Sequence, residues 1–358
     1  MRPAFASTGS AIAFLLLLAF VIVLPALMAR SDCFDRRDVY LSSPPHKNGD
    51  IPWIYSNIFE RKGNLDLVFV GSSRMWWGFD TPYVKNLLSE RLGRKADVIT
   101  LGWTYYGFDA TYICAKDLLD HRQVHTLVVY DDGGGDAPHI FSSHWFRVGE
   151  NADALVGLDF KGKMSLYAGA VLGMPRHILS MLRPNPPSRP DPSIVEEDGT
   201  AIRRFGFRTE SGNFSSFLPY EPPGGVPRGN AVSYSIETKS AFDFTGPKPP
   251  TYQIHFAKKL ASLCKEHGTQ LVFIHFPPIS ESKQTTIPER LPWPDVLDSP
   301  TYMIGVPAAS LFASMPASDI IKLYQDEDHF NLNGRTMFTR CIAPALIDIY
   351  ELHDRDHQ

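Results

Sequence analysis

The stretch that most constrains the fold of this 358-residue chain is residues 65–74, with the sequence LDLVFVGSSR. Five of its first six residues are apolar, and a short apolar run that ends at a glycine is typical of a buried β-strand. Gly71 permits a turn that most residues avoid, and Ser72, Ser73 and Arg74 follow at once. Because open α/β sheets bind their ligands beyond the carboxyl ends of strands, the pattern predicts a functional serine here.

The alternation of a short apolar strand with an amphipathic helix continues along the chain. We predict further strands at 97–102, 126–130, 270–276 and 302–306, and helices that begin near 81, 109, 251 and 333. Asp109 is predicted to cap the second of these helices. Three consecutive strand–helix repeats predict an α/β fold with a parallel sheet that helices cover on both faces.

Residues 183–250 interrupt this alternation. They hold 12 of the chain's 29 prolines, which argues against regular helix or sheet in this part of the chain. Their phenylalanine and tyrosine content argues against complete disorder. We therefore expect a long, partly ordered insertion over one end of the sheet, of the kind that often forms a lid.

An unbroken uncharged run occupies residues 11–28 and is long enough, at the lower limit, to span a membrane as a helix. We predict an uncleaved signal anchor in residues 1–30, followed by a single domain in residues 31–358. A signal peptide cleaved after Ala29 is the alternative.

The charges that flank this run are few. Arg2 precedes it, whereas Arg30, Arg36 and Arg37 follow it, so the positive-inside rule by itself argues mildly for a cytoplasmic domain.

The overall composition excludes some functions. A net charge of -4 provides no electrostatic footprint for binding nucleic acid. The glycine run at 133–135 is not a phosphate-binding loop because no Lys-Ser/Thr pair follows it, and the sequence suggests neither a cofactor nor a metal site. Of the four cysteines, Cys114, Cys264 and Cys341 fall on apolar helix faces and are predicted to be buried thiols, with a disulfide as the alternative.

A partner for the serine lies near the other end of the chain. A nucleophilic serine needs a base, and that base needs a group to orient it. His329 is the candidate base, and Asp326, three residues earlier, is the preferred orienting acid, with Asp328 as a weaker choice. The same segment also fits a polar surface loop or a fragment of a metal site. On the serine side, Ser72 is the rival nucleophile to Ser73, and either residue also suits a simple capping role.

A serine after the first strand and a late Asp-x-x-His together resemble the SGNH/GDSL hydrolase superfamily, over residues 65–130 and 251–350. The block Gly71-Ser72-Ser73 has Ser where many members have Asp, and so resembles the membrane-anchored branch. That branch includes the D-alanyl transfer protein of the teichoic-acid system and the alginate O-acetylation proteins. The resemblance implies a flavodoxin-like three-layer fold, with Ser73, His329 and Asp326 as the catalytic residues.

The resemblance also suggests where an oxyanion would be stabilised. The backbone N–H groups of Ser73 and Gly102 are the expected donors. The family usually adds an Asn after the third strand, but the sequence here is YDDGGGD, without Asn. Either a backbone N–H of the 133–135 run replaces that Asn, or catalysis is weak.

Three residues beside the serine are candidates for substrate binding. Arg74, Trp76 and Trp77 are placed to contact a sugar ring, although packing in the core is the competing interpretation for both tryptophans.

The function implied by the resemblance is an O-acyltransferase or acylesterase that acts on a cell-surface polysaccharide. It would be anchored in the inner membrane, with its domain in the periplasm or extracytoplasmic space, and would work beside a membrane-bound O-acyltransferase. The alternatives are a general carboxylesterase and a non-catalytic glycan-binding partner of such an acyltransferase.

Overall fold

Two compact units make up the chain in the computed structural model, residues 1–43 with 136–187, and residues 44–135 with 188–358. The residues that the structure describes are 5–28, 36–41, 51–105, 107–131, 135, 137–140, 142, 154–169, 182, 199, 232–234, 250–282, 297, 301–313 and 315–356.

The second unit is built on a mixed sheet. Its described strands are β1 (Leu65–Gly71), β2 (Val98–Gly102), β3 (Val124–Tyr130), β4 (Val232–Tyr234), β5 (Gln270–Ile274) and β6 (Tyr302–Gly305). They lie in the order β2-β1-β3-β5-β6-β4; β4 is antiparallel to β6, and the other pairs are parallel. The prediction of an α/β fold with a parallel sheet is confirmed.

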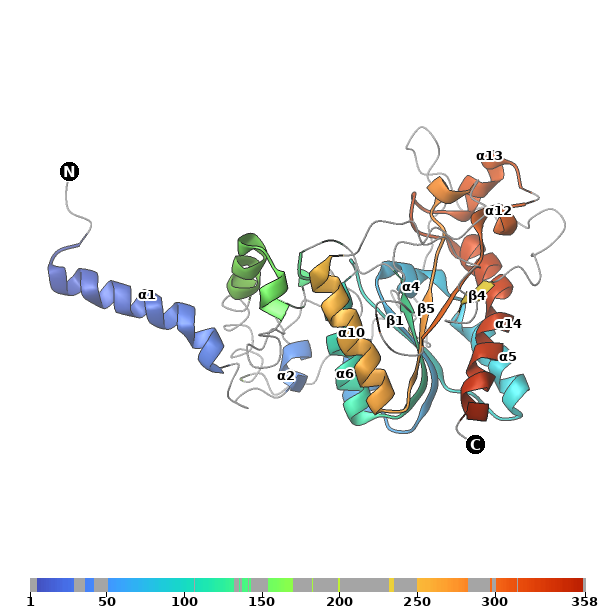
Figure 1. Cartoon of the computed structure of the whole chain (residues 1–358), viewed down its shortest axis with the longest axis horizontal. Coiled ribbons are helices and arrows are strands. Elements are labelled where there is room, and N and C mark those ends of the chain that lie inside the picture. Colours follow the sequence, from blue (N-terminus) through green and yellow to red (C-terminus); the bar gives the residue numbers. More distant parts are fainter. Residues whose placement is uncertain are drawn as a thin grey trace. The chain divides into compact units, whose positions relative to one another are not determined.

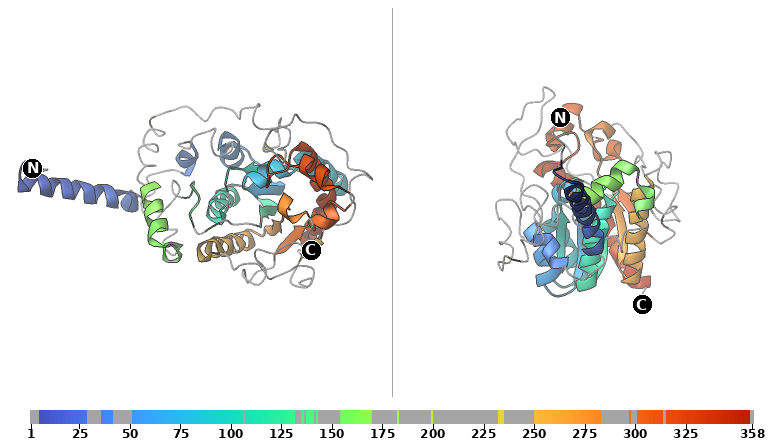
Figure 2. Two further views of the ribbon diagram at one scale, coloured as in Figure 1. Left: turned by 90° about the horizontal axis from the view of Figure 1, so that it is seen from above. Right: turned by 90° about the vertical axis from the view of Figure 1, so that its left-hand side faces the viewer.

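Helices cover both faces of this sheet. On one side lie α4 (Ser73–Gly78), α5 (Thr81–Leu92) and α14 (Leu332–Asp356), and on the other lie α6 (Phe108–His121) and α10 (Thr251–Glu266). Figure 1 shows α6 and α10 on one face with α5 and α14 on the opposite face, and Figure 2 shows the same layers from two further directions. The predicted covering of both faces is therefore confirmed.

The other described helices are the long α1 (Thr8–Met28) and several short ones. The short ones are α2 (Arg36–Leu41), α3 (Ile51–Tyr55), η1 (Ser56–Glu60), η2 (Ala154–Gly157), η4 (Ile279–Glu281), α12 (Ala308–Leu311), α13 (Ala317–Ile320) and η5 (Ile321–Leu323).

The central strands form because their side chains are buried on both faces. Leu67, Phe69 and Val128 belong to the core beneath α5 and α14, whereas Phe273 meets Phe108 of α6 on the opposite face. A parallel sheet between two helical layers selects continuous apolar strands of this kind. This is why the apolar runs of the sequence were sufficient to predict the strands.

The first edge of the sheet is β2, and it is partly covered by residues that precede β1. The indole N–H of Trp53, on α3, donates to the carbonyl of Thr100 at 2.9 Å. Such a cap satisfies a backbone acceptor that an edge strand leaves open.

The second edge corrects a prediction. Residues 183–250 were expected to lack regular sheet, but residues 232–234 form β4 and pair with β6. The expectation is wrong there because prolines are clustered on either side of these residues rather than within them. Most of the predicted insertion, including any role as a lid, lies outside the described residues.

One helix cap was also predicted wrongly. The N-cap of α6 is Gly107, and Asp109 instead lies in the first turn, where its buried carboxylate accepts a hydrogen bond from Tyr252 of α10 at 3.0 Å. The carboxylate predicted to cap the helix thus binds a residue of another helix instead, a contact that the local sequence does not reveal. The predicted start of α5 near residue 81 is confirmed, with Asp80 as its N-cap, and the helix ends at Gly93.

The cysteines and the N-terminal helix complete the comparison with the sequence. Cys114, Cys264 and Cys341 are buried thiols, as predicted, and Cys33 lies outside the described residues. The predicted N-terminal helix is α1, with exposed apolar side chains from Ile12 to Val23. Judged by length and hydropathy over the described residues, none of the helices qualifies as a membrane span.

A buried charged cluster joins β3 to the segment after β5. The imidazole of His275 lies between two carboxylates, with Nδ1 2.7 Å from Asp131 and Nε2 2.8 Å from Glu281. All three side chains are at most 5% exposed. Burial lowers the pKa of His275, but the hydrogen bonds and charges of Asp131 and Glu281 outweigh it and raise the pKa from 6.5 to about 9. The cluster therefore holds an imidazolium between two acids at neutral pH.

This cluster predicts how stability changes with pH. Because the pKa of His275 is higher in the folded chain than in the unfolded one, its contribution is complete below about pH 6.5 and is lost as the pH rises through about 9. We expect the thermal midpoint of the wild type to fall across this window. His275→Gln should lower the midpoint at neutral pH, at a cost of about 3 kcal/mol, and should flatten the fall.

The control is His267→Gln, which changes a histidine with a one-third exposed side chain. It should leave both the midpoint and its pH dependence close to wild type. Parallel pH curves for the wild type and His275→Gln, measured by circular dichroism, would contradict the proposed charge state.

Candidate active site

The turn after β1 presents Ser73 and assigns a different task to Ser72. Gly71 has φ +148°, a conformation that a residue with a side chain rarely adopts. The Ser72 side chain caps α4 by accepting the N–H of Arg74 at 3.3 Å, and Ser72 is only 2% exposed. Ser73 is the first residue of α4, so of the two candidate serines the structure aims Ser73 at the rest of the site.

The opposite side of the site is the loop from Tyr324 to Phe330, which we call the His loop. A bridge between its two ends and a hydrogen bond of 2.8 Å from the N–H of Gln325 to the carbonyl of His329 close it. Asn331 then accepts the N–H groups of Asn333 and Gly334 and so marks the start of α14.

Asp326 organises the inside of the His loop. Its carboxylate accepts the backbone N–H groups of Asp328 at 3.0 Å and His329 at 2.8 Å, and it lies 2.8 and 2.9 Å from Nδ1 of the His329 ring. The acid and the imidazole are thus held together by the turn itself, as the Asp-x-x-His spacing suggested.

The three predicted residues meet in one chain of contacts. Ser73 Oγ lies 2.7 Å from His329 Nε2, although 256 positions separate the two residues in the sequence. Ser73 is 9% exposed, and the side chains of His329 and Asp326 are 20% and 34% exposed, so the group lies at the surface of the unit. A serine, a base and an orienting acid in this order can perform acyl transfer.

The charge on Asp326 suits its position. Burial opposes ionisation, but hydrogen bonds from the His329 side chain and from two backbone N–H groups lower the pKa of Asp326 to about 2. An ionised Asp326 accepts a hydrogen bond from the Nδ1–H of His329. The other ring nitrogen, Nε2, then carries no proton and can accept a hydrogen bond from the Ser73 hydroxyl.

Asp328, the weaker candidate for the orienting acid, is directed elsewhere. Its carboxylate pairs with the guanidinium of Arg74, whose other nitrogen donates to the Tyr130 hydroxyl at 2.5 Å and to the Phe276 carbonyl at 3.4 Å. Arg74 was predicted to bind substrate, but it is only 9% exposed and its described partners belong to the protein. Sequence reasoning missed these contacts because the three partners of Arg74 come from three separate segments, each remote from it in the sequence.

The two tryptophans differ in environment. Trp76 is 6% exposed and packs over Gly102, so the core interpretation holds for it. Trp77 is partly exposed, and its ring lies edge-on to the His329 ring at 5.0 Å between centroids. Of the two, Trp77 is therefore the one that borders the candidate site.

The predicted oxyanion donors lie at the same end of the sheet, at the carboxyl ends of β1 and β2. Gly102 pairs with Gly71 in register, and a Cβ at Gly102 would lie 2.3 Å from the Cβ of Trp76, so α4 packs directly on this glycine. Ser73 is at the first position of α4, where a backbone N–H has no acceptor within its own helix. Residues 132–134 of the glycine-rich loop lie outside the described residues.

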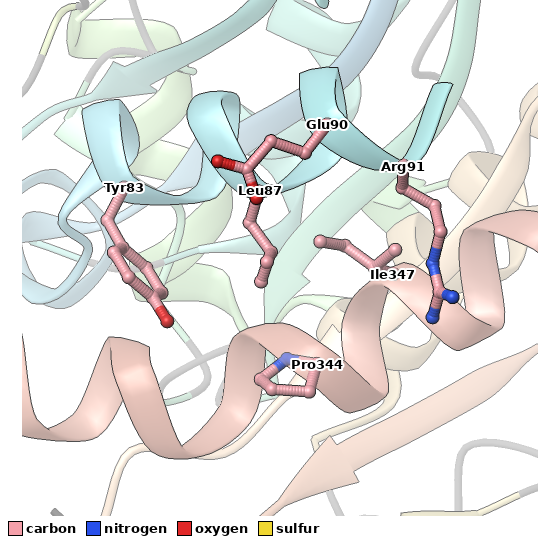
Figure 3. A pocket seen from close by; sticks show the side chains of 6 residues that line it. All are labelled: Tyr83, Leu87, Glu90, Arg91, Pro344 and Ile347. Atoms are coloured by element: carbon pink, nitrogen blue, oxygen red, sulfur yellow. The ribbon is translucent and has the colours of Figure 1, made fainter. Parts of the chain in front are cut away.

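A hollow of about 370 Å³ lies elsewhere, between α5 and α14. Figure 3 shows the side chains that line it, which are Tyr83, Leu87, Glu90 and Arg91 of α5 with Pro344 and Ile347 of α14. It includes none of the predicted site residues. In the part of the chain that the structure describes, no set of three or more His, Cys, Asp or Glu side chains is grouped to hold a metal ion.

Comparison of the chain with family models, with curated proteins and with solved structures produced no match.

The geometry predicts different outcomes for the two serines. Ser73→Ala should abolish covalent labelling by a fluorophosphonate and lower any acyl turnover by about 10³-fold or more, because it removes the hydroxyl that His329 contacts. Ser72→Ala should still label, and should cost about 1 kcal/mol of stability through loss of the helix cap. Intact-mass spectrometry measures the labelling, and the reverse pattern would show that Ser72 is the nucleophile.

Proposed function

We propose that this protein is an SGNH-like serine O-acyltransferase or acylesterase that acts on a cell-surface polysaccharide. The observation that carries the proposal is the 2.7 Å contact between Ser73 Oγ and a His329 ring that Asp326 holds through Nδ1. The fold supports it as well, since the five parallel strands follow the order second, first, third, fourth, fifth in chain order. In this flavodoxin-like order, the direction in which successive strands are added reverses beside β1. Ser73, the first residue of α4, follows the end of β1 at this point.

The proposed reaction has two halves. In the first, Ser73 Oγ attacks the carbonyl carbon of an acyl ester while His329 Nε2 takes the hydroxyl proton and then delivers it to the leaving alcohol. In the second, a hydroxyl of the acceptor gives its proton to Nε2 and attacks the acyl carbon of the acyl-serine. The bond from that carbon to Ser73 Oγ then breaks, Nε2 returns the proton to Oγ, and the acylated product leaves. Asp326 stays ionised throughout and stabilises the imidazolium of both steps.

Stabilisation of the oxyanion is assigned to backbone groups in this proposal. The N–H groups of Ser73 and Gly102 are the proposed donors, whereas the SGNH family usually adds an Asn side chain after the third strand, where this sequence has none. Fewer side-chain donors favour slow chemistry, so the proposal places this protein nearer to a transferase than to a fast hydrolase.

The proposed acceptor is a glycan, bound through exposed aromatic faces. Trp77 borders His329, and Tyr105, three residues beyond the end of β2, is 66% exposed with φ +65°. A bulky residue held in that conformation marks a strained turn of the sort found at binding sites. A membrane-bound O-acyltransferase is the proposed source of the acyl group.

Transfer and hydrolysis are separable by their products. With the full chain, hydrolysis of p-nitrophenyl acetate should be weak, and addition of the correct polysaccharide should raise acyl release and yield acylated sugar. Mass spectrometry of the products from a panel of surface polysaccharides provides the readout, with Ser73→Ala as the inactive control.

The alternatives predict other outcomes. Fast hydrolysis that no acceptor changes would establish a general carboxylesterase. Absence of turnover and of covalent label, with glycan binding intact, would establish a non-catalytic glycan-binding protein.

We also propose that residues 1–30 anchor the protein in the inner membrane, with the catalytic residues on the extracytoplasmic side. The support is the uncharged run of residues 11–28, all of which lies in α1, with exposed apolar side chains from Ile12 to Val23. The full chain should fractionate with membranes and resist extraction by high salt, because burial of apolar groups rather than charge would hold it there.

A pair of variants tests the anchor. Leu17→Arg should weaken membrane retention, because a charge in the middle of such a helix costs about 3 kcal/mol of insertion free energy. The control is Phe160→Arg, which changes an exposed residue outside α1 and should fractionate like the wild type. A mature protein that begins at Arg30 would show that the segment is cleaved.

A further inference from the structure

Arg74 is an unusual residue to find buried, since charged side chains are almost never fully buried without a partner. It follows Ser73 directly on α4. Its guanidinium reaches the end of β3 through the Tyr130 hydroxyl, the segment after β5 through the Phe276 carbonyl, and the His loop through Asp328. One side chain therefore connects the segment that carries Ser73 to three other parts of the unit.

The internal contacts of the His loop do not determine where the loop lies relative to Ser73. The bridge between its ends and the hydrogen bonds accepted by Asp326 all join residues of the loop to each other. They preassemble the Asp326–His329 pair, but they would be unchanged if the whole loop moved away from α4.

Contacts with the rest of the unit must set that distance. At the base of the loop, the Tyr324 hydroxyl donates to the Pro277 carbonyl, and the N–H of Ile279 donates to the Glu327 carbonyl at 3.0 Å. Both of these hold the loop to the segment after β5. The ion pair of Arg74 with Asp328 is different, because it joins the neighbour of Ser73 to the neighbour of His329.

We propose that the Arg74–Asp328 pair positions His329 against Ser73, so that Arg74 and Asp328 are positioning residues of the catalytic site. This inference rests on the proposed function. Arg suits the role because its planar guanidinium offers several donors at fixed angles, whereas a lysine ammonium is a single point charge. Asp328 acts through Arg74 and is not the acid that orients the imidazole.

A merely structural role makes a different prediction. The Asp328 side chain is 55% exposed, and exposed ion pairs contribute little to folding free energy. A positioning role concentrates the effect on the reactivity of Ser73, because a misplacement of about 1 Å at a reacting pair can cost about 10²-fold in rate. Large loss of reactivity with little loss of stability is thus the expected signature.

The experiment measures the rate constant for fluorophosphonate labelling of the full chain, together with its thermal midpoint. Asp328→Asn and Arg74→Lys should each label more slowly than wild type by about 10-fold to 10²-fold. The double variant should label no more slowly than Arg74→Lys alone, since both changes break the same contact. With an ester substrate, kcat should fall while KM stays close to wild type.

The matched control is Glu327→Gln, which makes the same change of charge one residue away in the same loop. The described contact of Glu327 with another segment uses its backbone carbonyl, so this variant should label at the wild-type rate.

The results separate the two proposals. A wild type that does not label contradicts the proposed function and the positioning role with it. A wild type that labels while Asp328→Asn labels equally fast overturns the positioning role alone. Equal slowing by Glu327→Gln, additive losses in the double variant, or unfolding of Asp328→Asn would likewise overturn it, because each would assign the effect to loop charge or to stability.

Discussion

The burial of β1 on both faces and its pairing along both edges is the constraint on which the rest of the unit depends. All seven residues of β1 are buried, and the strand pairs in parallel with β2 on one side and β3 on the other. A shift of one residue would exchange the side chains that pack against the two helical layers and would disrupt the close packing on both faces. The residue at which β1 ends, and with it the position of Ser73, follows from this constraint.

The end of the sheet carries two polar clusters, one buried throughout and one in which the buried Arg74 pairs with the half-exposed Asp328. The Asp131–His275–Glu281 cluster joins β3 to the residues after β5, and the Arg74 contacts join α4 to the His loop. Compared with a well-packed apolar replacement, a buried ion pair adds little net stability, although removal of one of its partners is costly. The contribution of the two clusters here is geometric, because each of them holds together segments that are distant in sequence and that meet next to Ser73.

Within the proposed function, the serine, histidine and aspartate explain how an acyl-serine forms but not what happens to it. Water and a glycan hydroxyl would be activated by the same imidazole nitrogen, so the choice between hydrolysis and transfer depends on what surrounds the group. The acceptor subsite is proposed on two aromatic residues, the partly exposed Trp77 at one side of His329 and the exposed Tyr105 beyond β2. Under this proposal, the residues around the serine and histidine, rather than these two residues themselves, select the acceptor.

The sequence by itself determined the layers, the strand that ends at Gly71 and the start of α5, and it favoured Asp326 over Asp328 as the partner of His329. Each of these rests on local information, namely the period of apolar residues, a helix cap, or a spacing of three residues within one turn. The tertiary structure decided that Ser72 caps while Ser73 faces His329, that Asp109 binds Tyr252, that residues 232–234 form an edge strand, and that Arg74 bonds to the protein itself. These outcomes depend on distances between side chains that are remote in the sequence, some more than 250 residues apart. A local pattern of residue types does not specify such distances, because only the packed sheet brings those groups together.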